Sequence, residues 1–139
     1  MTVSNHDLFH LLQQKSRHIK KILNIKLTDH DLYMAQWSIL YCLHKFGPMT
    51  QKEILIYLNV EAPTLTRTIA RMEDNGWIVR REGEDKRERI IELTETAIGN
   101  FPHIKETVGE MEVELLRRFS TEEKEQLYTL LQKITPIGK

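Results

Sequence analysis

The 139-residue sequence contains a single cysteine, Cys42, so no internal disulfide bond can form. It also lacks a run of about 18 apolar residues, the length that a membrane-spanning helix requires. The segment from Met1 to Asp7 does not have the basic-then-apolar pattern of a secretion signal. With 40% hydrophobic and 29% charged residues, the composition is that of a globular protein. These absences predict a cytoplasmic protein that has no membrane partner.

The chain has no excess of either charge, because 20 basic residues are balanced by 20 acidic ones. The balance also holds locally, since residues 61–89 contain seven Lys or Arg and seven Asp or Glu. Most nucleic-acid-binding domains carry a basic excess. Any positive surface here must therefore come from geometry, with arginines on one side and carboxylates on the other. Modest non-specific affinity for DNA would follow.

Sequence motifs of catalysis and metal binding are missing as well. The chain has no Gly-rich phosphate loop, nucleophile elbow or HExxH sequence, so we expect neither enzymatic activity nor a cofactor. His6 and His10 have a spacing that can chelate a metal, but no third ligand lies nearby in sequence, and we predict no metal site. Cys42 lies among apolar helix residues, which favours a buried, inert thiol over a redox sensor.

The region from Thr50 to Thr94 has the pattern of two short helices followed by two strands. Thr50 and Glu53 form a capping box before an apolar run, and Pro63 suits the first turn of the second helix. Gly76 is placed to close that helix in the left-handed conformation. The strands are expected at 77–82 and 89–93, flanking a charged loop. This order predicts a winged helix-turn-helix, which is a fold built to bind duplex DNA.

The second helix of this unit has two different faces. Leu65, Ile69 and Met72 recur at spacings of four and three and should face the core. The other side carries small polar side chains and arginines, which can approach the major groove and donate to base edges and phosphates. The candidate DNA contacts on this helix are Pro63, Thr64, Thr66, Arg67 and Arg71. The hairpin adds the cations Lys86, Arg87 and Arg89 as candidates, and the alternative for its loop is an ordinary charged turn.

Helical apolar patterns bracket the winged unit at about 5–25 and 95–136. Pro102 should kink or interrupt the helix after Thr94 near Asn100. The last helix should begin at Ser120 and bury four apolar residues, namely Leu127, Leu130, Leu131 and Ile134. These terminal helices are more apolar than one small core needs, which favours a homodimer in which they interlock. The alternative is a helical cap folded back on its own domain.

The predicted fold is therefore mainly α with a small β-hairpin. A single domain covers 1–139, with the winged helix-turn-helix at about 33–94 and dimerisation helices on both sides. A symmetric dimer would place two recognition helices about 34 Å apart, one turn of DNA.

The chain resembles the MarR family of bacterial transcriptional regulators from about Leu8 to Ile134. Residues 36–40 (QWSIL) are similar to the family's second helix, and 63–67 (PTLTR) with 72–78 (MEDNGWI) are similar to its recognition helix and exit. Residues 85–87 (DKR) followed by 90–94 (IIELT) are similar to its wing.

The resemblance implies a homodimer that binds a palindromic operator, with repression in most members, activation in some, and often a small-molecule or oxidant signal. By position, Thr64, Thr66 and Arg67 would face the major groove, and Arg87 would enter the minor groove. Asp85 would orient the wing by pairing with Arg87 or Arg89. Glu61 departs from the family, which usually has Ser there; its carboxylate could cap the helix through the dipole but would repel phosphate.

Two alternatives remain open at this point. Tyr33, Trp37 and Tyr41 could line a pocket for a small aromatic effector, or could simply be core residues at helical spacing. The winged fold could also serve as a protein-interaction module without DNA binding, which the lack of positive charge would suit.

Overall fold

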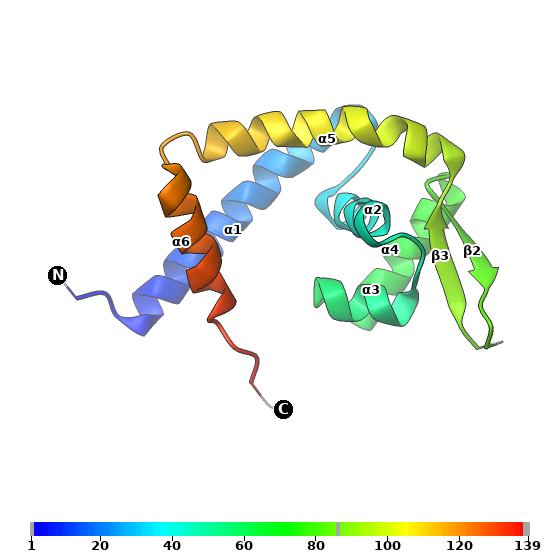
Figure 1. Cartoon of the computed structure of the whole chain (residues 1–139), viewed down its shortest axis with the longest axis horizontal. Coiled ribbons are helices and arrows are strands. Elements are labelled where there is room, and N and C mark those ends of the chain that lie inside the picture. The colour runs from blue at the N-terminus through cyan, green and yellow to red at the C-terminus, as the bar shows by residue number, and fades with distance from the viewer. Residues whose placement is uncertain (1, 86, 138–139) are drawn as a thin grey trace. The chain divides into compact units, whose positions relative to one another are not determined.

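A computed structural model describes residues 2–85 and 87–137 of the chain (Figure 1). Its elements are, in order, α1 (Asn5–Leu27), the 3-10 turn η1 (Thr28–His30), α2 (Met34–Phe46), β1 (Met49–Thr50), α3 (Gln51–Leu58), α4 (Ala62–Asp74), β2 (Ile78–Glu82), β3 (Arg89–Leu93), α5 (Glu95–Leu115) and α6 (Thr121–Gln132). The chain divides into two compact units, Met1–Val108 and Gly109–Lys139. None of the helices in the described part combines the length and the apolarity that crossing a bilayer requires.

The predicted helix-turn-helix is confirmed, and its ends are formed by the expected residues. Thr50 Oγ1 accepts a hydrogen bond from the Glu53 amide at 3.1 Å, while Glu53 Oε1 accepts one from the Thr50 amide at 3.0 Å. This reciprocal capping box fixes the start of α3. Pro63 lies in the first turn of α4, and Gly76, just after that helix, has a φ of 82°. Only glycine adopts such a backbone angle at low cost, so the chain turns sharply there into the hairpin.

The sheet has three strands rather than the two expected from the sequence. The antiparallel order is β1-β3-β2, with Met49 opposite Ile91 and Thr50 opposite Ile90. Strand β1 has only two residues, so it is too short to show the alternation of apolar and polar residues by which a strand is recognised in a sequence. Its pairing attaches the start of α3 directly to the hairpin that forms the wing.

The core of the first unit brings α2, α4 and the N-terminal part of α5 together around the sheet. Leu65, Ile69 and Met72 on α4 are buried, as predicted. The Phe101 ring of α5 stacks with the rings of Trp37 at 5.4 Å and His44 at 3.9 Å between centroids. Aromatic pairs of this kind stabilise a core beyond the area that they bury.

Pro102 does not interrupt α5, which runs without a break from Glu95 to Leu115. Proline inside a helix costs about 3 kcal/mol through a lost hydrogen bond and a ring clash. The neighbouring side chains Phe101 and Ile104 are almost completely buried, and burial contributes about 1.5–3 kcal/mol each. Packing around the proline therefore offsets its local cost, and the predicted interruption is wrong.

Apolar side chains remain exposed on α1 and, separately, in the second unit. On α1 the exposed residues include Leu8, Phe9, Leu11, Leu12 and Ile19. In the second unit the four residues predicted to be buried are exposed instead, namely Leu127, Leu130, Leu131 and Ile134. Their predicted burial is therefore wrong for the single chain.

Candidate nucleic-acid interface

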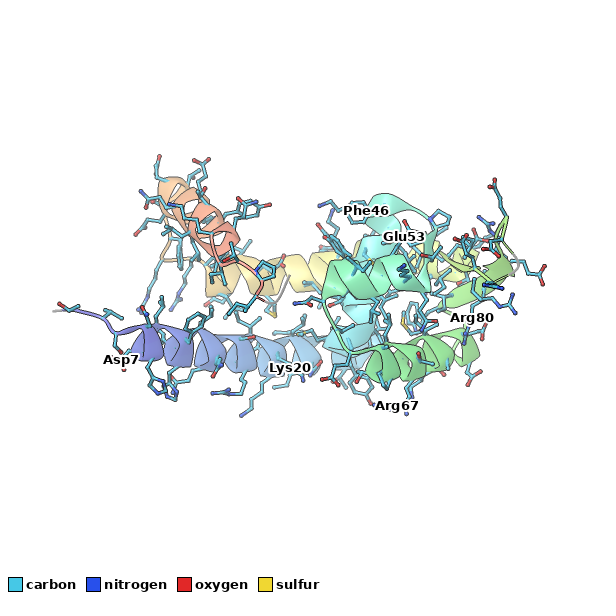
Figure 2. All side chains as sticks on the ribbon, turned by 90° about the horizontal axis from the view of Figure 1, so that it is seen from below. Asp7, Lys20, Phe46, Glu53, Arg67 and Arg80 are labelled. Carbon is cyan, nitrogen blue, oxygen red and sulfur yellow. The ribbon has the colours of Figure 1, made fainter. Side chains whose placement is uncertain are left out.

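The outward face of α4 carries every residue that the sequence assigned to it. Pro63, Thr64, Thr66, Arg67 and Arg71 are all exposed. Arg67 lies on the outer side of the helix, away from the rest of its unit (Figure 2). Opposite this face, Leu65, Ile69 and Met72 anchor α4 to the core. The helix is thus held by one side while its polar side stays free to meet a ligand.

The arginines of the winged unit fall into two groups with different surroundings. Arg80, Arg81 and Arg89, all on the strands, form ion pairs with Glu73, Glu92 and Glu82 at 3.3, 3.4 and 3.9 Å. By contrast, within residues 2–85 and 87–137 no carboxylate forms an ion pair with Arg67, Arg71 or Arg87. Three carboxylates thus pair with the strand arginines, while the arginines of α4 and the wing loop stay available to a ligand.

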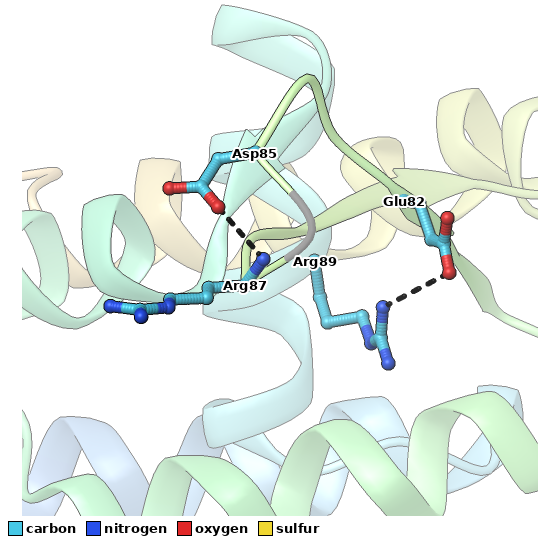
Figure 3. A network of polar contacts seen from close by, with 4 residues as sticks. All are labelled: Glu82, Asp85, Arg87 and Arg89. Atoms are coloured by element: carbon cyan, nitrogen blue, oxygen red, sulfur yellow. Dashed lines mark hydrogen bonds and ion pairs between the residues drawn. The ribbon is translucent and has the colours of Figure 1, made fainter.

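The wing loop is shaped by Asp85, but by a different contact from the one expected. Asp85 Oδ1 accepts a hydrogen bond from the Arg87 amide at 3.0 Å (Figure 3). The Asp85 carbonyl also accepts one from the Glu88 amide at 2.9 Å. Arg89 pairs with Glu82 instead. A short Asp side chain readily closes onto the backbone two residues ahead, and this local turn replaces the predicted pairing with a guanidinium. Lys86, predicted to contact DNA, lies outside the described residues.

One polar contact within the interface was not predicted from the sequence. Gln51 Nε2, at the start of α3, donates a hydrogen bond to Thr66 Oγ1 on α4 at 2.9 Å. The two residues are 15 positions apart, so neither helical spacing nor a motif points to the pair. The one feature of the sequence that points to Gln51 is its position directly after Thr50. Thr50 caps α3 and pairs with the sheet, so Gln51 lies at the anchored end of that helix.

Glu61 occupies the N-cap position of α4 without forming a capping bond. Its φ and ψ of −78° and 139° are suitable for a cap, but its side chain accepts no hydrogen bond from the first turn. The carboxylate is exposed beside the face that carries Arg67. It therefore adds negative charge near this face and leaves helix N–H groups without the side-chain partner that Ser would supply.

The three aromatic residues predicted to line an effector pocket have different environments. Trp37 is 8% exposed and stacks with Phe101, so it is a core residue. Tyr41 packs against Trp37 at 6.0 Å between ring centroids and is partly exposed, and Tyr33 is 59% exposed. The two tyrosines, rather than the tryptophan, are accessible to a small molecule.

Cys42 and the paired histidines His6 and His10 were the remaining candidates for a reactive or metal-binding site. Cys42 is fully buried, its thiol donates a weak hydrogen bond to the Ile39 carbonyl at 3.3 Å, and burial raises the pKa of this thiol to about 11. The rings of His6 and His10 lie 6.3 Å apart and nearly parallel. Among the residues that the structure describes, no three His, Cys, Asp or Glu side chains gather as they would around a metal ion.

Comparison with known proteins places these features in context. The profile of the MarR family matches residues 32–88. The uncharacterized HTH-type transcriptional regulator YwoH of Bacillus subtilis is 51% identical over 125 residues, which cover 90% of this chain and 91% of that protein. A mutant MarR from E. coli, solved in complex with operator DNA, superposes with a TM-score of 0.85 at 27% identity and covers 93% of this chain and 94% of its own. The apo form of wild-type E. coli MarR gives a TM-score of 0.76 at 27% identity over 98% and 100% of the two chains.

Proposed function

The chain belongs to the MarR family of transcriptional regulators, and we propose that it controls transcription by binding a palindromic operator in duplex DNA as a homodimer. Membership confirms a regulator rather than an enzyme. The observation that carries the DNA-binding proposal is that three exposed arginines of the winged unit form no ion pair within the described residues, namely Arg67 and Arg71 on α4 and Arg87 on the wing loop. Uncompensated guanidinium groups on one helix and one adjoining loop suit a polyanion.

On the operator, α4 enters the major groove with Thr64, Thr66 and Arg67 toward the base edges. Pro63 and Arg71 contact the flanking backbone, together with Lys86 and Arg89 from the hairpin. Arg87 reaches the minor groove, where a narrow A/T-rich segment attracts a guanidinium. The structural similarity to a MarR that was solved with operator DNA supports this arrangement.

The exposed apolar side chains support the homodimer. Leu8, Leu11 and Leu12 on α1 are exposed, and so are Leu130 and Leu131 on α6. A second copy would bury both sets and would set two recognition helices about one turn of DNA apart, as a palindrome requires. Such a regulator would act in the bacterial cytoplasm, where the chromosome lies.

A small aromatic effector would relieve repression by binding beside Tyr33 and Tyr41. Both side chains are exposed, while Trp37 between them in sequence is fixed in the core by Phe101. An occupant there would contact α2, the helix that packs against α4 and β3, and could thereby shift the DNA-binding unit.

Selection from a pool of random duplexes tests the proposal. The full chain is incubated with the pool, bound duplexes are amplified, and the enriched sequences are compared. The expected result is enrichment of an inverted repeat with half-site centres about 10–10.5 base pairs apart. The protein should hold duplexes that carry this repeat less tightly as the salt concentration rises. Absence of enrichment together with salt-independent behaviour would contradict it and favour the protein-interaction module.

A further inference from the structure

The contact between Gln51 and Thr66 joins the two helices of the helix-turn-helix by their polar sides. Gln51 Nε2 lies 2.9 Å from Thr66 Oγ1. Gln51 itself is held firmly, because Thr50 before it caps α3 with two hydrogen bonds and pairs with Ile90 of β3. The amide therefore reaches Thr66 from a backbone position that is fixed to the sheet.

The direction of this hydrogen bond decides what the Thr66 hydroxyl can offer to a ligand. A hydroxyl has one hydrogen to donate and two lone pairs that accept. Toward the Gln51 amide, Thr66 acts as the acceptor, so its hydrogen is not used in that contact.

Other hydroxyl groups on the helices behave differently. Thr68 Oγ1 donates to the Thr64 carbonyl at 2.9 Å, and Ser38 Oγ donates to the Met34 carbonyl at 2.9 Å, so the helix itself takes up their hydrogens. For Thr66, no such acceptor occurs among the described residues, and its side chain is exposed. Thr66 is thus a hydroxyl on the outward face of α4 with its hydrogen still to donate.

We propose that Gln51 is a positioning residue that fixes the Thr66 hydroxyl as a hydrogen-bond donor toward acceptor atoms of the operator. This inference rests on the proposed DNA-binding function. Acceptors that this hydroxyl could reach are N7 or O6 of a purine, O4 of thymine, or a phosphate oxygen. The amino groups of cytosine and adenine are themselves donors and cannot accept its hydrogen. Gln51 orders the hydroxyl before DNA arrives, so less freedom is lost on binding.

The test uses the full chain and two probes, a duplex selected from a random pool by the wild-type chain and a shuffled duplex of the same composition. Binding is measured by fluorescence anisotropy for Gln51→Met, Thr66→Val, the double variant, and Thr66→Ser. Thr68→Val on the same helix is the matched control, because the Thr68 hydroxyl donates to the Thr64 carbonyl within α4. Urea unfolding of each variant checks that the fold is retained.

Gln51→Met removes the contact that orders the Thr66 hydroxyl, and Thr66→Val removes the hydroxyl itself. Gln51→Met and Thr66→Val should each weaken binding to the selected duplex by about 3- to 10-fold, and the double variant should bind no more weakly than Thr66→Val alone. Thr66→Ser should restore affinity, and Thr68→Val should leave it unchanged. A base-edge acceptor predicts loss on the selected duplex alone, and a phosphate acceptor predicts equal loss on both probes.

A second substitution at Gln51 tests the direction of the hydrogen bond independently of Gln51→Met. In Gln51→Glu the introduced carboxylate suits the first turn of α3 and can only accept, so it takes up the Thr66 hydrogen and should weaken binding at least as much. Wild-type affinity in Gln51→Met, or additive losses in the double variant, would overturn the inference. Failure of the wild-type chain to enrich any duplex would instead refute the proposed function itself.

Discussion

Arg80 on β2 lies with its Nε 3.3 Å from Glu73 Oε1 on α4, so an ion pair connects the wing to the recognition helix. The Arg80 side chain is 27% exposed, and its Nε is buried. Partial burial makes the pair more sensitive to loss of one partner than a fully solvated pair would be. The contact adds a charged link between α4 and β2, which also pack against each other.

Removing the negative partner of this pair should destabilise the protein. Glu73→Gln leaves the Arg80 guanidinium partly buried without its counter-charge and should lower the free energy of unfolding by about 0.5–1 kcal/mol. Urea denaturation measures the change. Asp74→Asn removes the same charge from the next residue of α4, which is exposed and forms no ion pair in the described part of the chain, and should change stability much less.

The wing arginine should contribute to the salt dependence of DNA binding. Arg87→Ala removes one cation that neutralises a phosphate, so the slope of log K against log salt should become shallower by about one unit. Titrations of the selected duplex at several salt concentrations give the slope. Lys20→Ala, an exposed cation on α1, serves as the control. An identical slope for Arg87→Ala and the wild type would exclude this contact.

Glu61 is a position where substitution should improve the protein. Glu61→Ser supplies the missing cap of α4, worth about 1 kcal/mol, and removes a negative charge beside the DNA-binding face. Both the free energy of unfolding and the affinity for duplex should rise. Glu61→Gln separates the two effects, because it removes the charge without adding a preferred cap. Weaker DNA binding by both variants would show that the carboxylate assists recognition.

Cys42 should not react with thiol reagents in the native protein. Burial raises its pKa from 9.0 to about 11, so almost no thiolate is present near neutral pH, and the sulfur has no solvent contact. A maleimide probe should label the chain only after unfolding in urea. Rapid labelling of the folded protein would contradict this placement and reopen a redox role.

The helix-turn-helix could be predicted because its ends depend on local chemistry. Thr50 with Glu53 determines where α3 starts, while Pro63 suits the first turn of α4 and Gly76 follows its end. Residues up to three positions apart suffice to recognise each of these signals. The buried face of α4 followed from spacing alone. The family resemblance then indicated which residues of the other face would meet DNA.

What the sequence did not reveal depends on contacts between distant residues. Strand β1 forms through its pairing with β3. Helix α5 continues through Pro102 because Phe101 and Ile104 are buried. The hydrogen-bond partner of Thr66 comes from another helix. The contact of Asp85 is local, unlike these three, but it could not be predicted for another reason. An ion pair and a hydrogen bond to the backbone were both open to its carboxylate, and the structure has the second.

The affinity of Arg67→Ala for the selected duplex tests most directly whether α4 reads DNA. Arg67 is exposed at the centre of the outward face, and no ion pair within residues 2–85 and 87–137 competes for it. Anisotropy titration should show a loss of about 1–3 kcal/mol in binding free energy, with Lys105→Ala on α5 as an exposed control that binds normally. Unchanged affinity in Arg67→Ala would contradict the assignment of α4 as the DNA-reading helix.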